Sequence, residues 1–485
     1  MQRFPFLSTP VSLLVALGMA AGLGGCAVGP DYVRPAVEVP AAYKEGAPWQ
    51  PAQPATADAT TAWWQAYGDP LLDELVQQAN AANQDIAQAE AQYRQALAIA
   101  AEARAAYWPS VGATAGAGRA QTNTNGSKLA STYSVSLGAS WEPDLWGGVR
   151  RRVEAGEAGA RASADDAAAA RLSVQGALVQ NYLLLRVTDL QGELYAATIA
   201  AYTRSLKLTQ SQYAAGVVLR SDVALAETQL KSTQAQAVDL QALRSQLEHA
   251  IAVLLGKAPA SFSLPPLPRE QGTLAALRAM LPDTPAGLPS QLLQRRPDIA
   301  AAERRVAAAN AGIGVARSAY FPSLTLSAAA GFSSGGLGVL FDTPSRVWAL
   351  GAVLAQTLFD GGARDARQDQ AVAAYDASAA AYKATVLAGF RAVEDNLATL
   401  AVLQRESALQ DDAVAAARLA ERSTLNQYRA GTASYLAVVT AQVLALSNER
   451  AAVQLLGRQL AANVALVTAT GGGWRDEDVA ALAAN

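Results

Sequence analysis

The spacing of hydrophobic residues changes along the chain, and the same changes occur twice. Between residues 69 and 105 apolar positions recur every three or four residues, as on one face of a helix. Within residues 133–141 apolar residues alternate with serine and glycine, and this period of two predicts a strand with one apolar face. From residue 149 to 213 the helical spacing returns without a proline, so we expect a helix roughly 100 Å long.

Short motifs indicate that the second half of the chain repeats the first. Residues 212–216 read QYAAG and residues 427–431 read QYRAG, while residues 106–110 read AYWPS and residues 319–323 read AYFPS. Both pairs are separated by a little over 210 residues, and a constant offset of this kind indicates an internal duplication. Each copy is expected to contain a helix, a β-hairpin and a pair of long helices with coiled-coil packing.

The prolines, the glycines and the changes of period predict the boundaries of these parts. We expect a signal peptide (1–25), an N-terminal strap (26–68), a first repeat (69–256) with its hairpin (109–142) and helix pair (149–256), a proline-rich linker (257–289), a second repeat (290–471) with its hairpin (322–359) and helix pair (363–471), and a tail (472–485). Within the strap, Trp63, Trp64 and Tyr67 are expected to dock on the folded body.

The N-terminus has the features of a bacterial lipoprotein signal. Arg3 precedes a short apolar run that ends in Leu-Gly-Gly-Cys, and this run is too short for a spanning helix. Cys26 is the only cysteine, so no internal disulfide is available to it. We therefore expect cleavage before Cys26, lipidation of its thiol and, because Ala27 follows, delivery to the outer membrane.

Composition and motifs argue against several classes of function. The net charge of −3 and a pI near 5.5 do not favour nucleic acid as a partner. The single histidine, His249, lies in a helical pattern, where a surface or packing role is expected. Neither a Cys/His cluster, a phosphate-binding loop nor a nucleophile elbow is present in the sequence, so we expect neither an enzyme nor a bound metal or cofactor.

The strand count has a consequence for assembly. Two hairpins supply four strands, whereas a β-structure in a bilayer must close, and the smallest membrane barrels have about eight strands. Each chain is therefore expected to supply a fraction of a barrel in contact with outer-membrane lipid. Two copies would give about eight strands and three copies about twelve, and the strand count alone leaves both open.

Taken together, these motifs resemble one known family. The lipobox with CAVGPDYVRP after it, AYFPS before a hairpin, DLWGG and LFDGG after the hairpins, and the paired QYAAG and QYRAG tips are similar to the TolC-like outer-membrane factors. The lipoprotein branch that serves tripartite efflux pumps of the resistance-nodulation-division (RND) type is the best match. The resemblance implies a homotrimer with a 12-stranded outer-membrane barrel and a periplasmic α-helical barrel. It also implies a periplasmic adaptor (membrane fusion) protein and an inner-membrane RND-type pump as partners.

The resemblance also implies a gate at the periplasmic helix tips, where the turns are expected at Gly216 and Gly431. Asp222 matches the family's tip aspartate of the first copy, and Tyr428 matches the gate tyrosine of the second. Arg220 and Arg429 are either their partners at the tips or part of a solvated surface, and the sequence leaves both open. The chain departs from the family where the second copy often has acidic residues, since Ala437 and Thr440 occupy those positions.

Three functions remain open at this point. The first is a passive exit duct that conducts drugs or other small toxic compounds from a pump across the outer membrane. The second is the outer-membrane channel of a protein-secretion system. The third is a lipid-anchored coiled-coil scaffold without a pore, which the alternating strands disfavour.

Overall fold

The computed structural model describes residues 27–45, 62–122, 128–267, 273–282 and 289–474. Its contacts divide the chain into two compact units, which are described separately. The first comprises Met1–Ala36, Gln92–Ser163 and Ala301–Lys383, and the second comprises Val37–Ala91, Ala164–Ala300 and Ala384–Asn485. Helices α3, α4, α8 and α9 contribute residues to both units.

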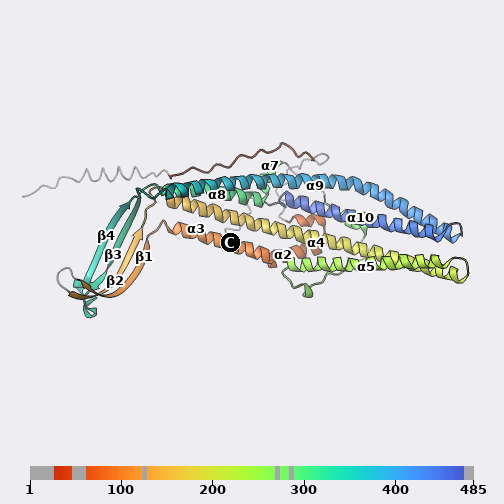
Figure 1. Cartoon of the computed structure of the whole chain (residues 1–485), viewed down its shortest axis with the longest axis horizontal. Helices are drawn as coiled ribbons and strands as arrows, with labels where there is room; N and C mark the ends of the chain where they lie inside the picture. The colour runs from red at the N-terminus through yellow and green to blue at the C-terminus, as the bar shows by residue number, and fades with distance from the viewer. Residues whose placement is uncertain (1–26, 46–61, 123–127, 268–272, 283–288, 475–485) are drawn as a thin grey trace, which may run out of the picture. The chain divides into compact units, whose positions relative to one another are not determined.

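The first unit contains one antiparallel sheet of four strands in the order β1-β2-β3-β4 (Figure 1). Its strands are β1 (Ser110–Thr122), β2 (Lys128–Trp141), β3 (Ser323–Ser334) and β4 (Arg346–Ala355). Strands β2 and β3 come from different repeats, yet they pair directly, so the sheet unites the two copies. Strands β1 and β4 are its edges.

The expected last strand, residues 347–359, is too long. The ladder ends where Ser323 pairs with Ala355, because Pro322 precedes β3 and has no backbone N–H to continue it. Strand β3 needs a glycine at position 331 where it pairs with β2, since a Cβ on Gly331 would lie 2.2 Å from the carbonyl oxygen of Val135.

The period of two gives the sheet two different faces. The register puts serine, threonine, glycine and small apolar residues on one face. The other face, called the apolar face below, carries Val111, Ala113, Ala115 and Ala117 on β1, Tyr133, Val135, Leu137, Ala139 and Trp141 on β2, Leu324, Leu326, Ala328, Ala330 and Phe332 on β3, and Trp348, Leu350, Ala352 and Leu354 on β4. Many of these side chains are exposed in the single chain, as expected for a surface that lipid covers.

Two helix pairs of equal length follow the hairpins. Helices α4 (Gly148–Ala214) and α9 (Ala363–Arg429) have 67 residues each, and α5 (Arg220–Leu254) and α10 (Tyr435–Ala469) have 35 each. An aspartate begins each long helix: Asp144 accepts from the backbone N–H of Val149 (2.9 Å), and Asp360 accepts from that of Arg364 (3.1 Å). Among the described residues, no helix combines the length and apolarity that crossing a bilayer requires.

The helix expected over residues 69–105 is interrupted, which the apolar spacing did not indicate. Helix α2 (Pro70–Ala82) ends before Asn83, and α3 (Gln84–Ala105) begins after it. Asn83 is extended, and its side-chain oxygen accepts from the N–H groups of Asp85 (2.9 Å) and Ile86 (3.1 Å). An asparagine that caps a new helix in this way stops the preceding one.

Short elements follow α5 in the chain. They are η2 (Pro259–Ser261), α6 (Leu274–Ala279) and α7 (Pro289–Arg295), and the last leads into α8 (Pro297–Ser318). Helix α6 is short but capped, since the Thr273 hydroxyl accepts from the N–H of Ala276 at 3.1 Å. The connection between β3 and β4 contains two further turns, η3 (Leu337–Val339) and η4 (Thr343–Ser345).

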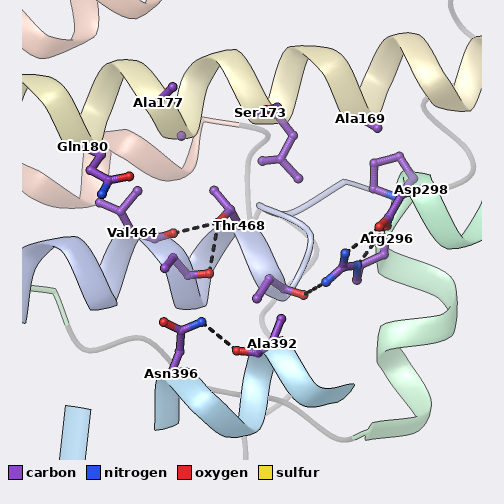
Figure 2. Close-up of a pocket in the computed structure, with 15 residues that line it drawn as sticks. Ala169, Ser173, Ala177, Gln180, Arg296, Asp298, Ala392, Asn396, Val464 and Thr468 are labelled. Carbon is purple, nitrogen blue, oxygen red and sulfur yellow. Dashed lines mark hydrogen bonds and ion pairs between the residues drawn. The ribbon is translucent and has the colours of Figure 1, made fainter. Parts of the chain in front are cut away.

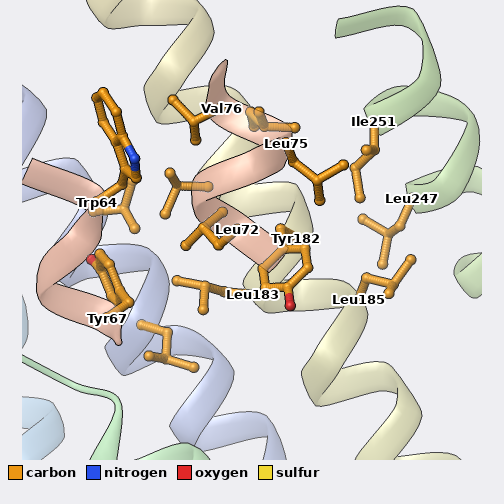
Figure 3. Packing of buried hydrophobic residues seen from close by; sticks show 14 of the residues in the cluster. Trp64, Tyr67, Leu72, Leu75, Val76, Tyr182, Leu183, Leu185, Leu247 and Ile251 are labelled. Carbon is orange, nitrogen blue, oxygen red and sulfur yellow. The ribbon is translucent and has the colours of Figure 1, made fainter. Parts of the chain in front are cut away.

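The main hydrophobic core lies in the second unit (Figure 3). Element η1 (Trp63–Tyr67) contributes all three expected anchors of the strap: Trp64 and Tyr67 are buried, and Trp63 is partly buried against them. They pack with α2, α4, α5 and α10, and the Tyr67 hydroxyl donates to Oδ1 of Asn463 at 2.7 Å. The Tyr182 hydroxyl donates to Asp69, the N-cap of α2. The first bond joins η1 in the strap to α10, and the second joins the start of α2 to α4.

An extended N-terminal segment docks on the first unit. The Arg151 side chain is only 6% exposed, and its guanidinium donates to the carbonyl oxygens of Val28 and Gly29 and to Asp31. The chain passes very close to α8, since a Cβ on Gly29 would lie 2.5 Å from Cα of Gly314. Further bonds run from Tyr32 to Glu303 (2.8 Å), from Arg34 to Tyr382 (3.0 Å) and from Asn310 to Pro30 (2.9 Å).

Candidate functional site at the helix tips

Each helix pair reverses at a glycine in the left-handed conformation. Gly216 has φ of +73° and Gly431 has φ of +74°, which other residues adopt only with strain. The N–H of Val217 donates to the carbonyl of Gln212, and the N–H of Thr432 donates to that of Gln427, both at 2.9 Å. These bonds form the helix stop that a glycine after a helical run predicts. The two turns therefore have the same construction.

Tyr428 lies inside the contact between the two tips. It is 6% exposed, and its hydroxyl donates to Oε1 of Gln212 on α4 at 2.5 Å. Its ring packs on that of Tyr435, with 5.3 Å between centroids, and against Ala226 and Val438. Burial raises the pKa of the Tyr428 hydroxyl, so it remains a neutral donor at neutral pH. One side chain thus contacts both helix pairs.

Asp222 belongs to the first turn of α5. Its carboxylate accepts from the backbone N–H of Leu219 at 3.3 Å, and this bond caps a helix whose N-cap residue offers no polar side chain. Its charge also lies close enough to contribute to the raised pKa of Tyr428. In the second copy the Ser434 hydroxyl accepts from the N–H of Ala437 (3.4 Å). The two tips therefore use different caps.

The remaining sequence-predicted residues lie on the surface of the tips. Arg220 and Arg429 are exposed, and no ion pair is described for either of them. Ala437 and Thr440 are not acidic, and the Thr440 hydroxyl donates to the carbonyl of Leu436 on its own helix at 2.9 Å. In the single chain Tyr428 is therefore buried between the two tips, whereas Asp222 caps its own helix and the two arginines are exposed.

Sequence reasoning missed the polar partners of the tip. Gln212 accepts the bond from Tyr428, although it stands in the motif that revealed the repeat. The Ser205 and Tyr435 hydroxyls lie 3.4 Å apart, and the Tyr202 hydroxyl donates to the carbonyl of Gln442 at 3.2 Å. Apolar spacing does not show which polar side chains will meet across two helices. The signal available was only the abundance of tyrosine in this region.

The second unit also contains a cavity of about 570 Å³ among α4, α8, α9 and α10 (Figure 2). Its charged groups are already paired. Arg296 donates to both carboxylate oxygens of Asp298 (2.9 and 2.5 Å) and to the carbonyl of Ala469 (3.0 Å). Asn396 donates to the carbonyl of Ala392 at 2.6 Å. The cavity therefore offers a ligand little unused polarity, and we assign it no site.

The predicted lipidation site, Cys26, lies outside the described residues. The next residue is described, because Ala27 lies against Gly147, where an added Cβ would come within 2.8 Å of the Ala27 Cα. The N–H of Val28 donates to the carbonyl of Trp146 at 3.1 Å. Trp146 follows β2 by five residues, so the described chain begins beside the base of the sheet.

The duplicated helix pairs and the four-stranded sheet with its exposed apolar face are typical of outer-membrane channels. The family model described as outer membrane efflux protein matches residues 75–257 and 288–472, one match for each repeat, and the chain belongs to this family. It is 32% identical to the probable efflux pump outer membrane protein TtgC of Pseudomonas putida, over 96% of each chain. It is also 32% identical to the pyoverdine export outer membrane protein OpmQ of Pseudomonas aeruginosa, over 86% of this chain and 88% of that protein.

A solved structure shows the same architecture. The outer-membrane channel OprN superposes with a TM-score of 0.86 at 31% identity, over 93% of this chain and 100% of that chain. The protein is thus an internally duplicated, mixed helical and β channel of the outer membrane that extends into the periplasm. It is the outer-membrane component of an efflux system. The expected family, fold class, location and efflux function are confirmed.

Proposed function

We propose that three copies of the chain close a 12-stranded barrel and form a passive exit duct for drugs or other small toxic compounds. The observation that carries this proposal is the open sheet. Its edge strands β1 and β4 have no partner within the described chain, while its apolar face is suited to lipid. Open edges are not tolerated in a bilayer, so β4 of one copy pairs with β1 of the next.

The duct acts without chemistry of its own. A periplasmic adaptor and an inner-membrane RND-type pump supply the cargo and the energy, and the channel supplies the path. This assignment is supported by relatives whose names describe efflux pumps or pyoverdine export. It makes the protein a conduit rather than an enzyme, without a cofactor.

The gate of this duct lies at the helix tips, between the turns at Gly216 and Gly431. Tyr428 and Asp222 hold the resting closure, and Arg220 and Arg429 contribute exposed charges that meet partners on other copies. Exposed ion pairs contribute about 0–1 kcal/mol each, so a docked adaptor can shift the tips by contacting the open arrangement more favourably. When the tips open, the buried hydrogen bond from Tyr428 to Gln212 must either break or move together with both helices.

The domain boundaries complete this proposal. Residues 1–25 direct export and are removed, and the lipid on Cys26 anchors the strap, residues 26–68, to the membrane. Residues 69–256 and 290–471 are the two repeats, joined by the linker at 257–289 and followed by the tail at 472–485.

Single-channel recording in planar bilayers tests the function. The purified full chain should conduct, and chemical crosslinking of the same sample in detergent should reach a limit at three chains. A scaffold would conduct nothing, and a limit at two chains would replace the proposed barrel by one of eight strands.

A further inference from the structure

The four strands carry charge at one end only. They contain no aspartate or glutamate, and their charged residues are Arg119, Lys128 and Arg346. All three stand at the end where a loop joins two consecutive strands. At the other end β1 follows α3, and β4 leads to α9. The loop end of the sheet therefore carries three positive charges, and Asp342 in the connection between β3 and β4 is the acidic residue described there.

The register puts both arginines on the apolar face. Arg119 pairs with Ser131 and stands two residues beyond Ala117, and Arg346 pairs with Phe332 two residues before Trp348. From Leu324 to Phe332 the apolar positions of β3 cover about 27 Å at 3.4 Å per residue. Because strands of outer-membrane barrels are tilted by about 40°, this length corresponds to a height of about 21 Å, close to the apolar band of about 25 Å. Arg346 is level with Phe332, the last apolar position of β3, and Arg119 lies four residues further along β1 than that level, so both stand at the loop end of the band.

The helices extend into the periplasm, so the loop end of the sheet lies at the cell surface. On the proposed function, Arg119 and Arg346 then face the headgroups of the outer leaflet rather than the pore. Both side chains are exposed in the single chain, and no ion pair is described for either of them. Phosphate is a natural partner, because a guanidinium binds its oxygens through two parallel hydrogen bonds.

We propose that Arg119 and Arg346 bind the phosphate groups of lipopolysaccharide in the outer leaflet. Aromatic residues beside Arg346 support a lipid contact: Trp348 is 77% exposed, and Phe341 packs edge-on against Phe332 with 5.4 Å between centroids. Aromatic residues are characteristic of this level of a membrane barrel, where they contact both headgroups and acyl chains.

Arg119 lies on β1 and Arg346 on β4, which are the two edge strands of the sheet. When β4 of one copy pairs with β1 of the next, Arg346 and Arg119 of the partner subunit border the same junction. A lipid with two phosphates can then contact both copies. The inference rests on the proposed trimer. It predicts that one outer-leaflet lipid binds at each junction between two copies.

Binding of bisphosphorylated lipid A to the detergent-purified full-length oligomer, followed by native mass spectrometry, tests the inference. The double variant Arg119→Gln/Arg346→Gln should bind the lipid roughly 25-fold more weakly, since each basic residue near an anionic surface contributes about fivefold. The control is Arg94→Gln/Arg391→Gln, which removes two exposed arginines from α3 and α9 and should bind as the unchanged protein does.

Two further probes identify the ligand. Dephosphorylated lipid A should bind the unchanged protein as weakly as the double variant binds the phosphorylated form, and phosphatidylglycerol should bind weakly as well. Equal binding by the variant, the dephosphorylated lipid or phosphatidylglycerol would overturn the inference. Conductance of the double variant should remain, so loss of lipid binding is distinct from failure of the proposed duct.

Discussion

The two tyrosines that precede the turn glycines occupy matching positions but different surroundings. Tyr213 of the first copy is 46% exposed, whereas Tyr428 of the second is 6% exposed and bonded to Gln212. Duplication has therefore preserved the residue and changed its contact. This difference supplies a matched pair of variants at one motif position.

We expect Tyr428→Phe to raise the conductance of the isolated channel, because it removes the hydroxyl bond between the tips while keeping the ring. The loss of one such bond should cost about 0.5–1.5 kcal/mol. Combination with Asp222→Ala should raise conductance further and admit large antibiotics into cells. Tyr213→Phe is the control and should leave conductance unchanged. If the double variant retains the resting conductance at every voltage, apolar packing holds the tips closed instead.

Glu421, which lies on α9 like Tyr428, allows a test of how the stability of the fold depends on pH. Burial and then the charge of Glu449 raise its pKa, whereas Arg418 and Arg422 act in the opposite direction. A carboxyl group whose folded pKa lies above its unfolded value stabilises the fold below the unfolded pKa. This contribution is lost as the pH rises through the folded pKa.

Glu421→Gln should therefore raise the thermal unfolding temperature at pH 7 and have little effect near pH 4. The measurement is thermal denaturation of the detergent-solubilised protein between these pH values. Glu227→Gln, on an exposed side chain of α5, should show no such trend. A gain for Glu421→Gln that is the same at both pH values would contradict the assignment.

At the scale of elements, the strands and long helices could be predicted because each has a regular apolar pattern. The pattern of Tyr133 to Trp141 lies within β2, and residues 149–213 lie within α4. The break at Asn83 could not be predicted, because the apolar spacing continues across it and the cap depends on the orientation of the Asn83 side chain. The tip contacts were equally hidden, since they depend on how two helix pairs pack.

The docked N-terminal segment shows how one buried side chain can hold a segment without regular structure. Arg151 donates to two carbonyl oxygens and to Asp31, whose own side chain is almost fully exposed. The ion pair with Asp31 is therefore screened by solvent, and the two carbonyl bonds (3.4 and 3.3 Å) add to it on a guanidinium that Glu154 also binds at 2.8 Å.

Arg151→Met should release this segment, which we expect to appear as faster proteolysis before residue 45 and a loss of about 1–3 kcal/mol in stability. Limited proteolysis followed by mass spectrometry measures the first effect, and chemical denaturation measures the second. The neighbouring exposed Arg152→Met is the control. Equal cleavage rates in the two variants would show that other contacts hold the segment.

At the scale of the whole molecule, the membrane contact has two proposed parts, a lipid anchor and a barrel. We expect Cys26→Ser to abolish labelling with palmitate and to reduce efflux only in part. Acyl chains contribute about 0.8 kcal/mol per buried CH₂ group, but the closed barrel spans the bilayer independently of them. Metabolic labelling and the sensitivity of cells to antibiotics give the two measurements. Label that persists in the variant would place the lipid elsewhere.

The equal lengths of the helix pairs restrict how this sequence can change. Helices α4 and α9 both have 67 residues, and α5 and α10 both have 35. The tips meet through Tyr428. Removing seven residues from one of these four helices alone would shift its end by about 10 Å and separate the tips. Insertions and deletions in one helix must therefore be matched in the other three. The length of the channel can evolve only when all four helices change together.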